Sequence, residues 1–349
     1  MELSIHPHLQ RRWQQQERKL AFAADSVERW RAWRGALVRK LRTLIGYPTF
    51  EAAPLQPQVT EEVRLEGYLR QRVVIQTEPE VWMPFFALVP DGARGPLPTV
   101  IAAHGHSSGG KSAVAGATDI PEVAESIRAF NYDYGVQLVK RGFLVLCPDA
   151  RGFGERQELV VKENPLTGSC QVINNMAMPM GQTVTGMWTW DLHRLLDYAH
   201  TRADCDRRRV GCAGLSGGGL QTLWATALDT QGRISCSVIS GYLYGYKESL
   251  LDLHGNCSCN YVPHLYEHVD MGDIAALIAP RPLLVETGDK DPLNGASGVD
   301  NVLSQLDIVR RAYQLHGAEE RLDHHVFPGE HRWHGGRALP FLERHLKEP

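Results

Sequence analysis

Short apolar runs, separated by polar segments that contain glycine, recur along most of the chain and are typical of buried strands. Between several of them lie longer stretches with apolar residues at helical spacing, such as 188–200, 218–228 and 301–317. Strands that alternate with helices predict a mostly parallel sheet covered on both faces, with ligands at the carboxyl ends of the strands. The strand-like runs are 99–103, 143–148, 209–214, 236–240, 281–287 and 324–327.

Two further apolar runs, 72–77 and 81–90, precede this series and are separated only by the short segment 78–80. A connection this short predicts an antiparallel pair of strands. Together with the alternating runs, the pair indicates a fold of the α/β class.

The N-terminal segment has a different pattern. Apolar side chains recur every three or four positions over 10–45, which predicts a helix with one slip in the spacing that Trp33 or Arg34 must fill. The opposite face is rich in Arg and Lys, and we expect it to be a solvated face of a helix packed on the body of the protein or on another subunit. We divide the chain into a helical extension and linker at 1–60 and a main domain at 61–349. The residues that end the helix and begin the linker are Gly46, Pro48, Pro54 and Pro57.

Length, charge and cysteine content limit the possible functions. The chain has 349 residues and a net charge of -3, which gives no reason to expect a nucleic acid partner. No apolar run reaches about 18 residues and the start is polar, so we expect no membrane span, no secretion and a cytoplasmic location. An odd number of cysteines fits reduced thiols in that compartment. They are Cys147, Cys170, Cys205, Cys212, Cys236, Cys257 and Cys259.

The stretch from Gly105 to Ser112 fits the P-loop pattern of nucleotide-binding proteins and follows a strand-like run. A P-loop needs a helix that begins at its Lys-Ser pair, because the amide groups at a helix N-terminus hold the phosphates. Here the continuation contains glycine and is stopped by Pro121, so it is a poor helix. A nucleotide-binding protein is therefore a minor alternative, and we expect Lys111 to be a solvated side chain.

A more specific motif lies further along the chain. Residues Gly214 to Gly218 fit the pattern G-x-S-x-G between a strand-like run and a helical stretch. In that setting Ser216 lies on a tight turn that exposes its hydroxyl, and the glycines let neighbouring backbone pass close by. A serine hydroxyl is a weak nucleophile, so it requires a base, and the base requires a third group that orients it.

Candidates for both groups follow Ser216 in the order that this motif requires, first an acid and then a histidine. Asp289 and Asp291 lie in the turn after one strand-like run, and His331 and His334 lie in the turn after the next. These turns should reach the same carboxyl edge of the sheet as Ser216. Turn position favours Asp291 and His331, with Asp289 and His334 as the alternatives.

The stretches HGHSSGGK, PDARGFGE, GLSGGG, LIAPRPLL, GDKDP and PGEHRWHG together resemble the α/β-hydrolase superfamily, in particular its dienelactone hydrolase and acetyl xylan esterase-like branch. The resemblance runs from about residue 70 to the end of the chain. It implies an α/β-hydrolase fold with a mostly parallel eight-stranded sheet. It also implies that the backbone N–H groups of His106 and Gly217 form an oxyanion hole, and that Asp149, Arg151 and Glu155 form a structural ion-pair network.

The segment 254–268 contains residue types that bind zinc. Its Cys-x-Cys spacing is tighter than that of the usual structural zinc sites, and no second cysteine pair exists, so we expect no metal site and no cofactor. The resemblance suggests instead that this loop, which includes Cys257, forms a wall of the substrate pocket. By residue type Trp188 and Tyr242 are further candidates for the pocket lining, and packing in the core is the alternative for both. The zinc-type residues of this segment are His254, Cys257, Cys259, His264 and His268.

These observations predict hydrolysis of a small carboxylic ester through an acyl-enzyme, with Ser216 as nucleophile, His331 as base and Asp291 as the group that orients it. The resemblance suggests an acetyl-type acyl group on a carbohydrate. A serine peptidase of the same fold and a catalytically silent binding scaffold are competing hypotheses. The expected partners are a small-molecule ester and, through the N-terminal helix, a second copy of the chain.

Overall fold

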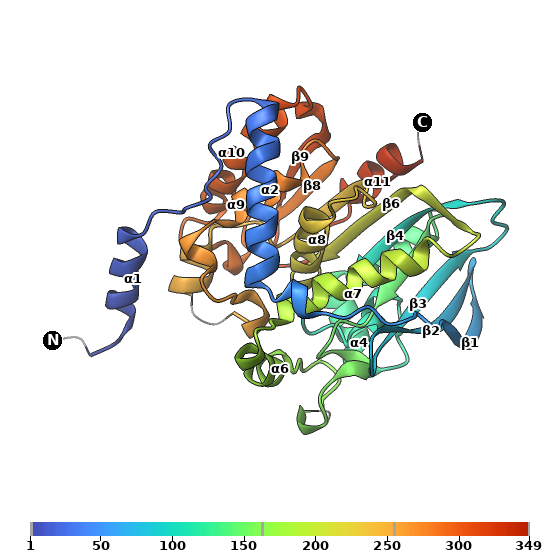
Figure 1. The fold of residues 1–349 in the computed structure, drawn as a ribbon. Coiled ribbons are helices and arrows are strands. Elements are labelled where there is room, and N and C mark those ends of the chain that lie inside the picture. The colour runs from blue at the N-terminus through green and yellow to red at the C-terminus, as the bar shows by residue number, and fades with distance from the viewer. Residues whose placement is uncertain (1–2, 162–163, 254–255, 348–349) are drawn as a thin grey trace.

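A single nine-stranded sheet lies at the centre of the structure, a computed structural model that describes residues 3–161, 164–253 and 256–347 (Figure 1). The strand order is β1-β2-β3-β5-β4-β6-β7-β8-β9. Neighbouring strands from β5 to β9 are parallel, and β1, β2 and β3 add antiparallel pairings at one edge. The strands are β1 (Gln58–Leu65), β2 (Tyr68–Glu78), β3 (Val81–Pro90), β4 (Leu97–Ala103), β5 (Leu144–Pro148), β6 (Cys205–Leu215), β7 (Cys236–Ser240), β8 (Leu283–Gly288) and β9 (Leu322–Phe327).

The strands agree with the sequence pattern except at this edge. The predicted antiparallel pair is β2 and β3, and the six later runs form β4 to β9, so the expected mostly parallel α/β sheet is confirmed. The sheet has nine strands and not eight, because β1 lies across the predicted boundary between linker and main domain, where no apolar run predicts a strand. Most side chains of β1 are exposed. An edge strand of this kind lacks the apolar run by which buried strands are recognised.

Helices cover both faces of the sheet. Successive strand residues point to opposite faces, so Val100 and Ala102 of β4 pack with α3, α4, α5 and α11, whereas Ile101 and Ala103 pack with α7 and α8. Figure 1 shows α2, α7 and α8 side by side over the second face. The helices are α1 (His6–Gln15), α2 (Val27–Leu44), α3 (Lys111–Val114), α4 (Pro121–Phe130), α5 (Tyr134–Val139), α6 (Cys170–Ala177), α7 (Val184–Ala199), α8 (Gly217–Leu228), α9 (Met271–Ala275), α10 (Val299–Leu315) and α11 (Ala338–Leu346).

The N-terminal segment forms two helices, so the single helix predicted over 10–45 is wrong in its middle part. Ser26 caps the start of α2, because its Oγ accepts a hydrogen bond from the backbone amide of Arg29 (3.3 Å). The chain between the helices is tied to the main domain, where the amide of Lys19 donates to the carbonyl of Glu267 (3.0 Å). Contacts with the main domain thus replace the helical hydrogen bonds that the apolar spacing predicts.

Helix α2 packs on the main domain, as expected. Trp30, Leu37, Val38 and Leu41 are buried and belong to the same hydrophobic cluster as the residues of α8 and α10. Helix α1, in contrast, buries none of its side chains. Among the described residues, no helix combines the length and the apolar character that crossing a membrane requires.

Candidate active site

Ser216 lies on a strained turn between β6 and α8. Its φ of 59° and ψ of -118° belong to a region that residues with a side chain rarely adopt, and its amide donates to the carbonyl of Ser240 (2.9 Å). The flanking glycines are required by close packing. A Cβ on Gly218 would lie 2.0 Å from the carbonyl oxygen of Ala103, and one on Gly214 would lie 2.5 Å from the backbone of Gly218. The turn therefore holds Ser216 at the carboxyl end of β6 in a fixed position.

Asp291 and His331 meet at the same edge of the sheet, in the turns that follow β8 and β9. The Nδ1 atom of His331 lies 2.6 Å from Oδ2 of Asp291. The other carboxylate oxygen of Asp291 accepts a hydrogen bond from the amide of Leu293 (2.9 Å), and the side chain is buried. Because a carboxylate only accepts hydrogen bonds, Nδ1 carries the proton and Nε2 is left as the basic atom of the ring.

Asp289 and His334, the second candidates for acid and base, make different contacts. Asp289 accepts a hydrogen bond from the amide of Gly329 (2.9 Å) and so fixes the turn after β9. The ring of His334 stacks on Phe327 with centroids 4.8 Å apart. The structure therefore brings together Asp291 and His331, and it does not pair Asp289 with His334.

A cavity of about 370 Å³ lies beside these residues, and both Ser216 and His331 line it. Cys257 lines it as well, but Trp188 and Tyr242 do not, so the expectation that these two form its wall is wrong. The indole nitrogen of Trp188 donates to the carbonyl of Arg151 (2.9 Å), and the hydroxyl of Tyr242 donates to Asn260 (2.9 Å), which holds both rings in the core. The residues that line the cavity are His106, Ser107, Phe130, Tyr132, Ser216, Asn256, Cys257, Leu293 and His331.

The loop after β4 lies against the turn that carries Ser216. A Cβ on Gly105 would lie 2.5 Å from the carbonyl oxygen of Leu215 and 3.1 Å from Cβ of Ser216. A Cβ on Gly217 would lie 2.9 Å from the ring of His106. The two glycines thus allow a close approach, and His106 and Gly217 lie together beside Ser216. That their backbone amides form an oxyanion hole stays a prediction.

The rest of the loop after β4 binds the carboxylate of Asp149, a residue of the same chain. Lys111 is buried, and its ammonium group lies 2.6 Å from Asp149 and also pairs with Glu155. The expectation of a solvated Lys111 is therefore wrong. The helix that begins there, α3, spans only Lys111–Val114. Both the lysine and the short helix are poorly suited to hold a nucleotide phosphate.

The prediction that Arg151 shares one ion-pair network with Asp149 and Glu155 is wrong. Among the described residues no ion pair joins Arg151 to either carboxylate, and Arg151 belongs to a second network. Arg151 and Arg156 both pair with Asp191 at the middle of α7, and Arg151 also pairs with Glu78. Burial alone would raise the pKa of Asp191, but the two guanidinium groups outweigh it and lower the pKa to about 2. Asp191 is thus charged over the physiological pH range and links α7 to the turn after β5.

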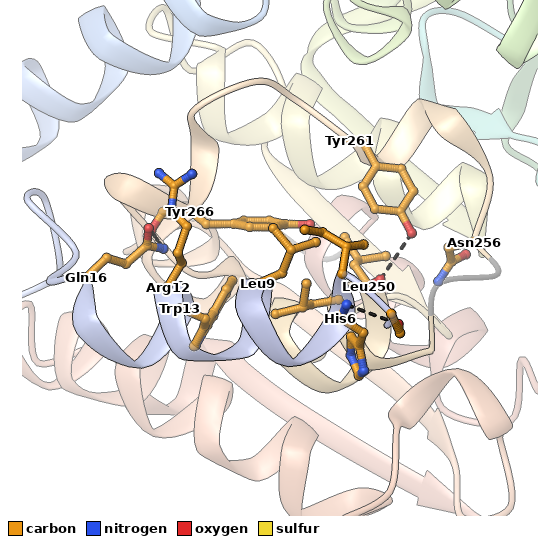
Figure 2. A pocket seen from close by; sticks show the side chains of 12 residues that line it. His6, Leu9, Arg12, Trp13, Gln16, Leu250, Asn256, Tyr261 and Tyr266 are labelled. Atoms are coloured by element: carbon orange, nitrogen blue, oxygen red, sulfur yellow. Dashed lines mark hydrogen bonds between the residues drawn. The ribbon is translucent and has the colours of Figure 1, made fainter. Parts of the chain in front are cut away.

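A second and larger cavity, of about 740 Å³, lies between α1 and the loop that precedes α9. Figure 2 shows Leu9 and Trp13 of α1 on one side of it and Tyr261 and Tyr266 on the other. Asn256 lines both this cavity and the one beside Ser216. The sequence does not predict this cavity, because nothing in it indicates where the polar helix α1 packs. His254, considered above as a zinc ligand, lies outside the described residues.

Comparison with known proteins places the chain among the hydrolases that it resembles. "Putative hydrolase YtaP" of Bacillus subtilis (strain 168) is 31% identical over 229 residues, or 65% of this chain and 71% of that protein. A solved structure titled "putative acetyl xylan esterase (BF1801)" from Bacteroides fragilis matches with a TM-score of 0.76 and 20% identity, covering 94% of this chain and 83% of that one. A glucuronoyl esterase from Solibacter usitatus matches with a TM-score of 0.68 and 18% identity, covering 93% and 96%.

At these identities the structural matches show the fold alone. The family is shown by a sequence model, described as "Abhydrolase family", that matches residues 4–344. The match includes the N-terminal helices as well as the main domain. On this evidence the chain belongs to the Abhydrolase family and has the α/β-hydrolase fold that its motifs predict.

Proposed function

We propose that this protein is a serine esterase that hydrolyses small carboxylic esters. One observation carries the proposal: the hydrogen bond of 2.6 Å between Asp291 and His331, in a site where His331 and the strained Ser216 line one cavity. A nucleophile, an acid and a base, in this order along the chain and on this fold, make up the catalytic set of serine hydrolases.

The reaction begins when His331 Nε2 takes the proton of Ser216 Oγ as this oxygen attacks the ester carbonyl carbon. Asp291 holds the ring in the tautomer that leaves Nε2 free and stabilises the imidazolium that forms. The oxygen of the tetrahedral intermediate becomes negative and accepts hydrogen bonds from the backbone amides of His106 and Gly217. One such donor contributes about 3 kcal/mol to transition-state stabilisation.

Collapse of the intermediate breaks the ester bond, and His331 gives its proton to the departing alcohol. Water then enters, loses a proton to His331 and attacks the acyl-serine. The second tetrahedral intermediate that forms then collapses and releases the carboxylic acid, and His331 returns the proton to Ser216. No step calls for a cofactor.

The cavity size supports a small acyl group, because about 370 Å³ is near the lower end of small-molecule sites. An acetyl-type ester on a carbohydrate fits this size, and two of the structurally similar proteins carry the names acetyl xylan esterase and glucuronoyl esterase. A peptidase is less well supported, because peptidases of this fold usually have an additional domain that screens substrates. The described residues form one sheet with its helices.

Turnover of p-nitrophenyl acetate by the purified protein tests the proposal, beside Ser216→Ala and the matched control Ser304→Ala on the exposed side of α10. We expect Ser216→Ala to lower kcat at least about a thousandfold and Ser304→Ala to leave it unchanged. Equal turnover by the unmodified protein and Ser216→Ala would remove Ser216 as the nucleophile. A fluorophosphonate probe that labels Ser216 in the unmodified protein provides a second readout, which does not depend on the choice of ester.

A further inference from the structure

The side chains of three cysteines and a histidine meet beside the proposed active site, and the ester chemistry uses none of these four side chains. His106 lies in the loop after β4, Cys170 begins α6, and Cys257 and Cys259 lie in the loop near Ser216. The three sulfur atoms and one ring nitrogen of His106 all lie within 4.8 Å of one another. Three segments that are far apart in the sequence therefore converge on one small volume.

Donors of these types form one of the usual tetrahedral sets for a structural zinc ion. In a tetrahedron with Zn–S bonds of about 2.3 Å and Zn–N bonds of about 2.0 Å, two sulfur donors are roughly 3.8 Å apart and a nitrogen and a sulfur donor roughly 3.5 Å apart. The Nε2 atom of His106 and the sulfur of Cys259 are 3.4 Å apart. Small side-chain movements are therefore enough for the four donors to enclose an ion.

The ring of His106 is oriented for such a role. Its Nε2 atom faces Cys259, and its Nδ1 atom faces the start of α8, 2.9 Å from where a Cβ on Gly217 would lie. Cys170 and Cys259 are each 1% exposed, so they reach the cluster from within the core. The sulfur atoms thus lie on the side of the ring that faces away from Gly217.

Two cysteines outside this cluster have, among the described residues, no such neighbours in the set of potential metal ligands. Cys147 and Cys236 are buried in strands of the sheet, and burial raises the pKa of each thiol, as expected for small core residues. Cys170, Cys257 and Cys259, in contrast, have their sulfur atoms beside one another and beside a ring nitrogen of His106. A thiolate is the form of cysteine that binds a metal ion.

The geometry points to a zinc-binding site formed by His106 Nε2 and the sulfur atoms of Cys170, Cys257 and Cys259. On binding, each protonated thiol gives its proton to solvent and the neutral imidazole donates a lone pair. Three thiolates and one Zn²⁺ ion leave the site with one negative charge. All four positions are filled by the protein, so the ion has no open position for substrate and its role is structural.

Such an ion would hold the loop whose backbone we assign to the oxyanion hole. His106 is fixed through its side chain, while its backbone amide faces the chemistry at Ser216 under the proposed function. The ion also links this loop to α6 and to the loop that lines the cavity. The site itself does not depend on ester hydrolysis, so the two can be tested apart.

Metal analysis of the full chain, purified without chelators and under reducing conditions, tests the site. We expect about one zinc ion per chain in the unmodified protein, in Ser216→Ala and in the matched control Cys205→Ser, whose thiol lies outside the cluster. In Cys170→Ser and Cys257→Ser we expect zinc affinity to fall at least about a hundredfold. The inference is overturned if the unmodified protein, after incubation with Zn²⁺, keeps no more zinc than Cys170→Ser.

Cobalt titration of the metal-free, unmodified protein gives a test that needs no variant. Intense thiolate-to-cobalt charge-transfer bands with tetrahedral d–d bands, both displaced by Zn²⁺, would support the site. Their absence would overturn it. Peptide mapping of protein purified under argon decides against it as well if it finds Cys170 in a disulfide with Cys257 or Cys259. Because Ser216→Ala keeps the cluster, failure of the esterase proposal leaves these results unaffected.

Discussion

The carboxylate of Asp149 fills the glycine-rich loop after β4, where its Oδ1 atom accepts a hydrogen bond of 2.7 Å from the backbone amide of Lys111. A Cβ on Gly110 would lie 2.1 Å from the same oxygen. The amide of Glu155 donates to the other oxygen at 3.1 Å. The loop thus holds an anion that belongs to the chain, in the place where a P-loop holds a phosphate.

Replacing Lys111 should therefore change the stability of the fold rather than the binding of a ligand. Lys111→Met leaves Asp149, which is fully buried, without its cation, and we expect a loss of about 3–5 kcal/mol in the free energy of unfolding. Lys140→Met, at an exposed site, should change this free energy by less than about 0.5 kcal/mol. Urea denaturation measures both. Equal midpoints for the two variants would show that the Lys111–Asp149 pair does not stabilise the fold.

Asp291→Asn tests the orientation of His331. The amide can donate as well as accept, so it no longer favours the ring tautomer that leaves Nε2 basic. We expect kcat to fall by about a thousandfold to ten-thousandfold. Asp289→Asn is the matched control and should keep turnover, because Asp289 contacts the turn after β9 and not the ring. If Asp289→Asn loses as much activity as Asp291→Asn, the assignment of the acid is wrong.

Glu286 makes stability depend on pH. Burial raises the pKa of this carboxyl from 4.5 to about 7, although the amide of Gly335 and the hydroxyl of Ser240 donate to it. The folded protein therefore holds a proton that the unfolded chain has lost, and stability falls as pH rises from about 4.5 through about 7. The total change from this group is on the order of 3 kcal/mol.

Glu286→Gln should remove most of this slope, because an amide does not ionise. Urea unfolding at pH 5 and pH 8 measures the change in stability for the unmodified protein and the variant. Glu122→Gln, at an exposed site on α4, serves as the control and should keep the slope. If the stability of Glu286→Gln and of the unmodified protein changes equally between pH 5 and pH 8, the pH dependence comes from other groups.

Two glycine-to-alanine substitutions should change stability in opposite directions, because one introduces a clash and the other improves helix propensity. Gly218→Ala puts a methyl group 2.0 Å from the carbonyl oxygen of Ala103, so we expect a loss of about 3 kcal/mol or more, together with loss of activity. Gly35→Ala lies within α2, where the added atom meets only the end of Arg39 at 3.5 Å. It should stabilise the protein by roughly 0.5–1 kcal/mol. Thermal melts that show no difference between the two would contradict the packing at Ser216.

The sequence predicts the strands well, because each interior strand is a short apolar run with turn residues at its ends. It fails at β1, whose exposed side chains look like those of a linker, and between α1 and α2, where contacts with the main domain outweigh helical spacing. Lys111 was expected in solvent because a lysine carries no sign of a buried partner. That partner, Asp149, lies 38 residues away along the chain.

For the site, motif order was informative because parallel strands bring their carboxyl ends to one edge, where Ser216, Asp291 and His331 now lie. Pocket lining was not predictable in the same way. Trp188 and Tyr242 have the right residue types, but their hydrogen bonds hold them in the core. The spacing of Cys257 and Cys259 argued against a metal site, because nothing in the sequence relates these residues to His106 or Cys170.

The order of the three groups along the chain has a consequence for synthesis. A ribosome makes Ser216 first, then Asp291, and His331 only after β9, the strand at the edge of the sheet. A nascent chain that already carries the nucleophile and its turn has no base and cannot activate it. Under the proposed function, the hydroxyl of Ser216 stays unreactive toward cellular esters until the sheet is almost complete, and folding itself switches on the chemistry.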